Sequence, residues 1–203
     1  MTAAAVAAAP AARRRTGEPR PAAWWGMVML VTTEAMVFVG LISAYFFVRA
    51  SAPHWPLGGI EPPDLLRPAI FSVLLIGSSV PVVLAEHAVQ RDQRGRAQLL
   101  LALAWLMAAA FLANHIKDQI DLGFGVRDNV YASLFVMITN LHALHVVGAL
   151  VMSAVVQVKV ATGRITSRHH MTLRVVGIYW HFVDGVWVVV FASLFLSPHL
   201  GTR

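Results

Sequence analysis

The chain contains no cysteine among its 203 residues. It therefore cannot form a disulfide, and it offers no thiolate for an iron–sulfur cluster, a zinc site or nucleophilic catalysis. A metal ion bound by this chain would need histidine and carboxylate ligands.

Charged residues are also scarce, at 13% of the chain, whereas 58% is hydrophobic and the mean hydropathy is +0.66. Soluble domains carry about a quarter charged residues. The composition therefore predicts an integral membrane protein. A net charge of +6 would suggest a nucleic-acid partner in a soluble chain. Here the cations lie between apolar runs, where they act as orientation signals, so no nucleic-acid partner is expected.

Five apolar runs approach or exceed the ~20 helical residues that a hydrocarbon core requires. They cover residues 24–48, 66–89, 97–116, 130–160 and 175–196. Proline, glycine and arginine clusters separate them. The sequence predicts an all-α integral membrane bundle of five transmembrane helices, formed by residues 23–203. Within the second run, Gly77, Ser78, Ser79 and Pro81 predict a close-packed kink.

The N-terminal residues 1–22 do not resemble a secretory signal, because Arg13, Arg14 and Arg15 follow the apolar run instead of preceding it. We predict a flexible cytoplasmic tail. If the five helices alternate in direction, eleven of the 16 lysines and arginines fall on the side of this tail. By the positive-inside rule, the N-terminus is cytoplasmic and the C-terminus lies outside.

Glu34 follows the start of the first run by enough residues to lie ~15 Å into the membrane. A bare carboxylate at this depth would be costly, so the side chain must be protonated, paired or hydrated. One reading is a neutral carboxyl bonded to a neighbouring helix. The other is a carboxyl that exchanges protons or meets lipid headgroups in a cleft.

Two further pairs of polar residues occur at membrane depth, His142 with His145 and His181 with Asp184, each three residues apart and therefore on one helix face. The two histidines could ligate a metal, but hydrogen bonding between helices is the favoured role. We predict that these four residues and Glu34 form one interior polar cluster. Near the fourth loop, Lys159, Arg168, His170 and Arg174 are candidate contacts for lipid headgroups.

Several segments together resemble subunit III of the haem-copper oxidases. Three of them follow the order and spacing of that family: Leu141-His-Ala-Leu-His-Val-Val-Gly148, Ser167-Arg-His-His170 and Tyr179-Trp-His-Phe-Val-Asp-Gly-Val-Trp187. Thr33-Glu-Ala-Met-Val-Phe38 and Ala44-Tyr-Phe-Phe47 resemble the family's first shared helix, so Glu34 matches its membrane-embedded carboxyl. Gly59-Ile-Glu-Pro-Pro63 and Asp128-Asn-Val-Tyr131 also fit. The resemblance covers about residues 24–200.

This resemblance implies a non-redox structural subunit of a respiratory terminal oxidase, which reduces dioxygen to water and pumps protons. The chain would hold no cofactor of its own. Haem and copper would lie in partner subunits, namely the catalytic subunit I and also subunit II. Family members stabilise the catalytic subunit, bind phospholipid and support proton uptake. The expected location is a bacterial-type cell membrane or another energy-transducing membrane.

Two departures and several alternatives accompany the resemblance. The two additional N-terminal helices of seven-helix relatives are missing, and His115 and Asp118 stand where relatives often carry glutamine or glutamate. Within the family, the alternatives are a quinol oxidase subunit or an accessory subunit of nitric oxide reductase, and the Gly59–Pro63 loop favours cytochrome c as the electron donor. A free-standing proton or solute transporter is a less favoured class, because no inverted repeat is visible.

The predicted topology can be tested directly, because the natural chain lacks cysteine. We expect Arg94→Cys and Arg164→Cys to react with an impermeant thiol reagent from the cytoplasm only. Leu57→Cys should react from outside only. Finding the cysteines at positions 94 and 57 on the same side would contradict the five-span topology.

Overall fold

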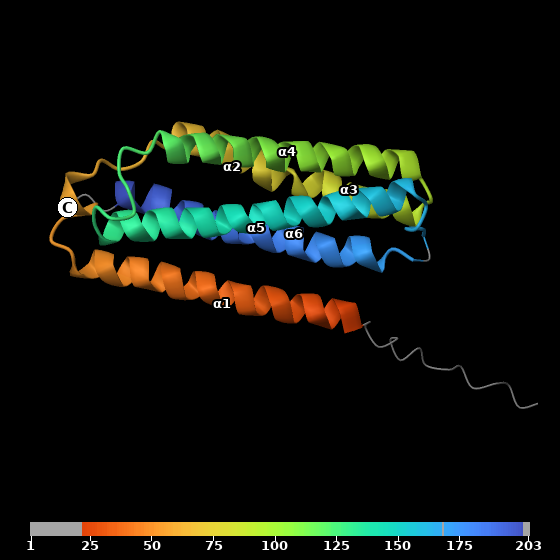
Figure 1. Cartoon of the computed structure of the whole chain (residues 1–203), viewed down its shortest axis with the longest axis horizontal. Coiled ribbons are helices and arrows are strands. Elements are labelled where there is room, and N and C mark those ends of the chain that lie inside the picture. Colours follow the sequence, from red (N-terminus) through yellow and green to blue (C-terminus); the bar gives the residue numbers. More distant parts are fainter. Residues whose placement is uncertain (1–21, 168, 201–203) are drawn as a thin grey trace, which may run out of the picture.

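Long helices run back and forth through the computed structural model, which describes residues 22–167 and 169–200 (Figure 1). The α-helices are α1 (Ala22–Ser51), α2 (Leu66–Gly77), α3 (Ser79–Gln90), α4 (Arg94–Ile120), α5 (Val130–Ala161) and α6 (Met171–Val190). Helix α6 continues through Phe191–Leu196, which is π-helical, and the 3-10 turn Ser197–Leu200. Another 3-10 turn, Leu57–Gly59, lies after α1. The described residues contain no β-strand.

Five segments are long and apolar enough to cross a membrane, which confirms the predicted all-α bundle with five spans. They are Ala22–Ser51, Leu66–Gln90, Arg94–Ile120, Val130–Ala161 and Met171–Leu200. Each extends a predicted run by at most four residues at either end. Residues 1–21 of the predicted tail lie outside the described residues. Ala22 belongs to α1 rather than to that tail.

Helix α5 illustrates how local sequence sets the ends of a span. The Asn129 side chain accepts a hydrogen bond from the Ala132 N–H at 2.9 Å, which satisfies one of the free amide groups of the first turn. The same side chain donates to the Leu57 carbonyl at 3.1 Å and so joins two loops. At the other end, Gly163 has a φ of 73°, the left-handed conformation that commonly terminates a helix.

The second span is broken at Ser78, as its sequence predicts. Helix α2 ends at Gly77 and α3 begins at Ser79. Pro81 lies in the first turn of α3, where its missing N–H is tolerated. A Cβ atom at Gly77 would lie 3.4 Å from Met107 Cε of α4, so the glycine permits close packing. The break turns a hydroxyl-bearing segment toward α6.

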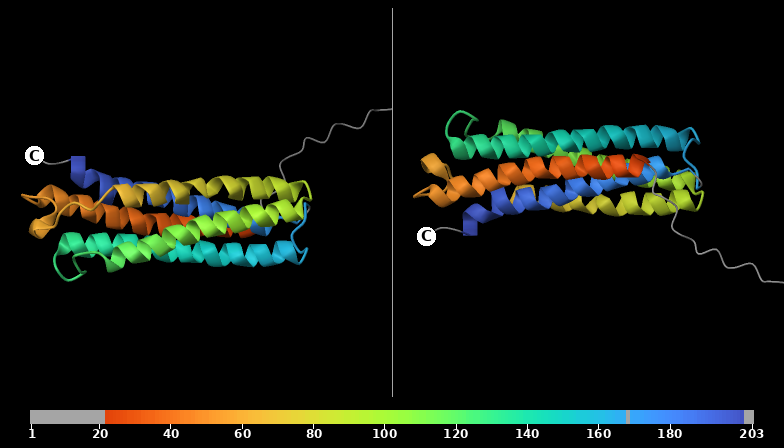
Figure 2. Two further views of the ribbon diagram at one scale, coloured as in Figure 1. Left: turned by 90° about the horizontal axis from the view of Figure 1, so that it is seen from above. Right: turned by 90° about the horizontal axis from the view of Figure 1, so that it is seen from below.

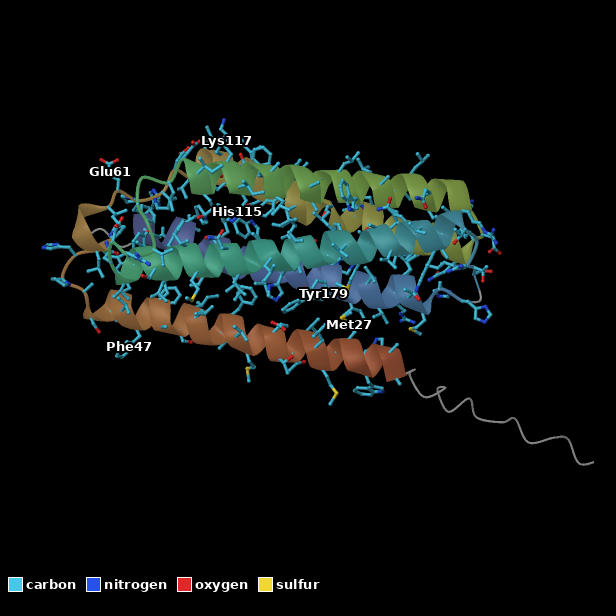
Figure 3. The ribbon with its side chains drawn as sticks, in the orientation of Figure 1. Met27, Phe47, Glu61, His115, Lys117 and Tyr179 are labelled. Atoms are coloured by element: carbon cyan, nitrogen blue, oxygen red, sulfur yellow. The ribbon has the colours of Figure 1, made fainter. Side chains whose placement is uncertain are left out.

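Helix α5 lies in the interior and α1 at the periphery (Figure 1). In the most apolar window of α5, 56% of the residues are buried, compared with 11% in α1. The buried residues of α1 are Met27, Phe38 and Tyr45, whose spacing places them on one helix face. Met27 and Tyr179 pack in the same core between α1 and the rest of the bundle, whereas Phe47 points outward (Figure 3).

The two ends of the bundle are held by different polar contacts. Arg49 donates to the Ser197 hydroxyl at 2.6 Å and to its carbonyl at 2.8 Å, which fixes the end of α1 to the C-terminal segment. At the opposite end, Asp92 accepts from the Ser167 N–H at 3.2 Å and hydroxyl at 2.9 Å. The arginine-rich loops, between α3 and α4 and between α5 and α6, lie at the end of the bundle where α1 begins (Figure 2).

Candidate functional site

The carboxyl group of Glu34 in α1 meets the ring of His145 in α5. Glu34 Oε2 lies 3.2 Å from His145 Nε2. The side chain of His145 is 10% exposed and that of Glu34 is 35% exposed. The structure therefore gives the single carboxyl group of α1 a partner from another helix, on a surface that an additional molecule can reach.

The contact of the other ring nitrogen of His145 limits the protonation states that the pair of Glu34 and His145 can adopt. His145 Nδ1 lies 2.8 Å from the Leu141 carbonyl, which can only accept, so Nδ1 carries a proton. Nε2 then either accepts a hydrogen bond from a neutral Glu34 carboxyl group or, when it is protonated, donates a hydrogen bond to an ionised Glu34. Both arrangements place a single proton between the two groups and leave the pair without net charge. The pair is thus suited to storing or exchanging one proton at membrane depth.

Aromatic side chains surround the pair. The centre of the Phe38 ring lies 5.2 Å from that of the His145 ring, and the Tyr179 ring is stacked nearly parallel to the His145 ring at 6.5 Å. A Cβ atom at Gly148 would lie 3.3 Å from the Tyr179 hydroxyl oxygen, so a side chain at this position would displace Tyr179. These contacts limit the movement of the histidine and keep its Nε2 directed at α1.

Ser79 connects the other predicted pair. Its hydroxyl oxygen lies 2.8 Å from His181 Nδ1 and donates to Asp184 Oδ2. Asp184 is 6% exposed, whereas His181 is exposed. The other oxygen of Asp184, Oδ1, is buried and has no hydrogen-bond partner among the described residues. The spacing of His181 and Asp184 therefore serves a contact between α6 and the start of α3.

Two tryptophans of α6 extend this contact along α2 and α3. Trp180 Nε1 donates to the Ser78 hydroxyl at 2.9 Å, and Trp187 Nε1 donates to the Ser72 hydroxyl at 2.7 Å. Sequence reasoning assigns only a packing role to Ser78 and Ser79 and does not single out Ser72. The available signal was the recurrence of serine in an apolar run beside a helix rich in tryptophan.

His142 is separate from both groups. Its side chain is 1% exposed, and neither ring nitrogen has a hydrogen-bond partner among the described residues. The ring lies 4.8 Å from Trp187 and 6.1 Å from Phe111. His142 thus occupies an aromatic environment one turn away from the pair formed by His145.

The five residues predicted to form one cluster are therefore divided between two hydrogen-bonded groups and an isolated ring. Among the described residues, no hydrogen bond links Glu34 and His145 with Ser79, His181 and Asp184. The physical reason is the different partner of each helix face: α5 turns His145 toward α1, whereas α6 turns Asp184 toward α3.

The candidate headgroup contacts lie around the loop between α5 and α6. Arg174 Nε is 4.0 Å from Glu86 Oε1, and His170 Nδ1 is 2.8 Å from the Ser167 carbonyl. Lys159 is half-buried in the last turn of α5. Arg168 lies outside the described residues. In the part of the chain that the structure describes, no three histidine, aspartate or glutamate side chains come close enough to hold a metal ion.

The fold and these contacts define a class: a membrane protein with five helical spans whose buried acidic and imidazole groups are bonded across helices. Comparison with known sequences gives the family. The profile described as Cytochrome c oxidase subunit III matches residues 17–198. The chain belongs to the cytochrome c oxidase subunit III family.

Individual relatives agree with the profile. The chain is 31% identical to cytochrome c oxidase subunit 3 of Thermostichus vulcanus over 172 residues, which cover 84% of this chain and 85% of the relative. It is 31% identical to the Synechocystis protein of the same name over 173 residues, with 85% and 74% covered. The Cyprinus carpio protein of that name is 32% identical over 177 residues, with 84% and 68% covered.

The pair between Glu34 and His145 generates a prediction about charge. We expect Glu34→Gln to preserve assembly, because the amide can donate to His145 Nε2. Glu34→Lys should disrupt it, since a second donor faces the histidine and a lysine near the membrane centre costs about 3 kcal/mol. The measurement is the yield and thermal stability of the assembled protein, with Met36→Gln on the exposed face of α1 as control. Normal assembly of Glu34→Lys would show that the position is solvated.

Proposed function

We propose that this chain is a non-redox subunit of a respiratory terminal oxidase, cytochrome c oxidase, in which it stabilises the catalytic subunit and supports proton uptake. The observation that carries the proposal is family membership over nearly the whole length of the chain. The relatives share the name cytochrome c oxidase subunit 3. The partners in the proposed complex are the catalytic subunit I, subunit II and membrane lipid, and no nucleic acid is involved.

The distribution of polar groups supports a role without a redox centre. The chain has no thiolate. The two ring nitrogens of His145 contact Glu34 and the Leu141 carbonyl, and the Nδ1 atom of His181 contacts the Ser79 hydroxyl. These bonds hold helices together. In the proposed complex, haem and copper are bound by the partner subunits, and dioxygen is reduced there.

A role in proton uptake rests on the pair formed by Glu34 and His145. The pair holds one proton, and the carboxyl side of it is partly exposed on the bundle surface. A partner subunit or ordered water at this surface would complete a route by which the proton leaves or enters. When that proton leaves, the pair carries a net charge of −1, and the return of a proton restores neutrality.

The five spans and the distribution of cations support a proposal for the location of the chain. We place the chain in a bacterial-type cell membrane, or another energy-transducing membrane, with the N-terminus in the cytoplasm. The basic loops beside Asp92 and Ser167 then face the cytoplasm. In this orientation Lys159, His170 and Arg174 lie at the level of phospholipid headgroups. Arg168, which lies outside the described residues, belongs to the same proposal.

The electron donor distinguishes the alternatives within the family. We propose cytochrome c, whereas a quinol oxidase and an accessory role in nitric oxide reduction are the alternatives. Haem spectra and mass analysis of the complex that copurifies with this chain decide between them, since the three complexes contain different partner subunits. Solute uptake by the isolated chain in vesicles would instead support a transporter.

We predict that the isolated chain binds no stoichiometric haem, copper or zinc, because it has no thiolates and its paired histidine is occupied by hydrogen bonds. Elemental analysis and visible spectra of the purified chain provide the measurement. One tightly held transition-metal ion per chain, lost in the double variant His142→Ala and His145→Ala, would contradict the structural role of these histidines.

Removing this chain from the oxidase complex tests whether it supports the catalytic subunit or takes part in catalysis itself. We expect the partner subunits alone to retain their haem and copper spectra and a measurable initial rate of oxygen consumption. Activity should then decline faster during turnover than in the complete complex, most clearly at alkaline pH, because the proton-entry region of the partner loses its covering helices and lipid. The measurement is a time course of oxygen consumption in lipid at neutral and alkaline pH.

Two results would contradict parts of this proposal. Immediate loss of both spectra and activity in correctly assembled partner subunits would mean that this chain contributes ligands or substrate-binding groups. An unchanged rate and lifetime would remove the role in proton uptake and leave assembly as the function. Restoring the complete chain provides the control.

A further inference from the structure

A cavity of about 580 Å³ opens at the end of the bundle opposite the arginine-rich loops. It lies between the beginning of α2, the end of α4 and the C-terminal part of the last span. Its deep part is lined by aromatic rings, those of Phe71, Phe111, Phe135, Trp187 and Phe195. Ligand sites typically have about this volume and an apolar lining with a few polar groups. Neither Glu34 nor His145 lines the cavity, so it is distinct from the site described above.

The mouth of the cavity has an excess of negative charge. Four carboxyl groups line it, those of Glu61, Asp64, Asp118 and Asp121, together with one cation, Arg67. Arg67 lies 3.4 Å from Asp118. The other three carboxyl groups form no salt bridge within residues 22–167 and 169–200. Figure 3 shows Glu61 on the loop at the end of the molecule, with His115 deeper, between α4 and α5. The mouth thus favours a cationic group.

Asn114 marks where such a group would lie. Its side chain lines the cavity and is 8% exposed. Its amide nitrogen donates to Asp118 at 2.7 Å, whereas Oδ1 is buried and accepts no hydrogen bond from the described residues. The neighbouring polar side chains are directed elsewhere in the described residues: His115 contacts Asn140, and Gln119 donates to Thr139. A buried carbonyl oxygen of this kind requires an N–H or O–H donor.

We propose that the cavity binds an amphiphile with a protonated amine head. The apolar chain packs against the aromatic floor. The ammonium group lies at the level of Asn114 and Asp118, donates a hydrogen bond to Asn114 Oδ1 and is attracted by the carboxylates of the mouth. A carboxylate-headed amphiphile would be repelled there. An alcohol of the same length would satisfy Asn114 without compensating the charge.

The ammonium head could belong to a free alkylamine or to an ethanolamine phospholipid, and one labelling experiment distinguishes these sources. Gly123 lines the mouth, and a Cβ at this position meets no atom within 4 Å. The full chain carrying Gly123→Cys is placed in phosphatidylcholine vesicles, and its reaction with a neutral maleimide is followed. Gly95→Cys is the matched control, because Gly95 is equally unobstructed and lies at the other end of α4.

Dodecylammonium should slow labelling of the cysteine at position 123 about tenfold at ~10 times its dissociation constant. The cysteine at position 95 should be unaffected. Dodecanol and dodecanoate at the same membrane concentration should protect much less. Protection in vesicles that contain phosphatidylethanolamine, without added amine, would identify the lipid as a source. The headgroup of phosphatidylcholine has no N–H donor and therefore provides the baseline.

Two substitutions test the residues that define the site. Asn114→Leu should weaken protection by dodecylammonium roughly tenfold, since a hydrogen bond to a charged group is lost. Gln98→Leu is its control, because Gln98 also has a buried, unpartnered amide oxygen in α4 but does not line the cavity. If Asn114→Leu fails to fold, Asp121→Asn at the mouth should also weaken protection, with Glu86→Gln at the opposite end as control.

Three results would overturn the proposal. Equal protection by the amine, the alcohol and the carboxylate would mean that the cavity accepts any apolar chain. Absence of protection by all three would mean that it is not a site for amphiphiles. Equal effects of Asn114→Leu and Gln98→Leu would show that the loss comes from a general change in the bundle.

Discussion

The need to satisfy polar groups in the absence of water governs the interior of this bundle. A carboxyl or imidazole group surrounded by hydrocarbon is costly unless it is bonded or neutralised. Glu34 and His145 meet this requirement through their contact across α1 and α5, and the Ser79 hydroxyl contacts His181 and one oxygen of Asp184. Each contact joins two helices, so the same bonds that neutralise the polar groups also determine which helices are neighbours.

The position of Glu34 links stability with function. Helix α1 is the least buried span, and Glu34 provides a polar contact between it and α5. Because the carboxyl group also remains partly exposed, a change in the position of α1 would alter the environment of the proton.

The break between α2 and α3 interrupts a continuous helix, but serines in this span form hydrogen bonds with α6. It presents Ser72, Ser78 and Ser79 to the polar atoms of α6. Tryptophan packs well in an apolar interior but needs a partner for its N–H group, and serine supplies one without much volume. The same tryptophan, Trp187, forms part of the floor of the cavity. The kink thus contributes to helix packing and to the shape of the cavity.

Sequence was sufficient for the features that depend on composition and local spacing. The length of apolar runs determines how many helices cross the membrane, because the thickness of the hydrocarbon core is fixed. Gly77 and Pro81 identify the kink, since their backbone properties are intrinsic. The spacing of His142 and His145 predicts that both lie on one side of a helix, and the motifs identified the family.

Tertiary structure decided which polar groups meet. A spacing of three residues defines a helix face but does not specify the neighbouring helix. In the folded bundle His145 contacts Glu34 of α1, whereas the ring of His142 packs against Trp187 and Phe111. The partner of Asp184 is a serine from a helix about a hundred residues earlier in the chain. The acidic mouth and aromatic floor of the cavity likewise come from segments far apart in sequence, and only packing brings them together.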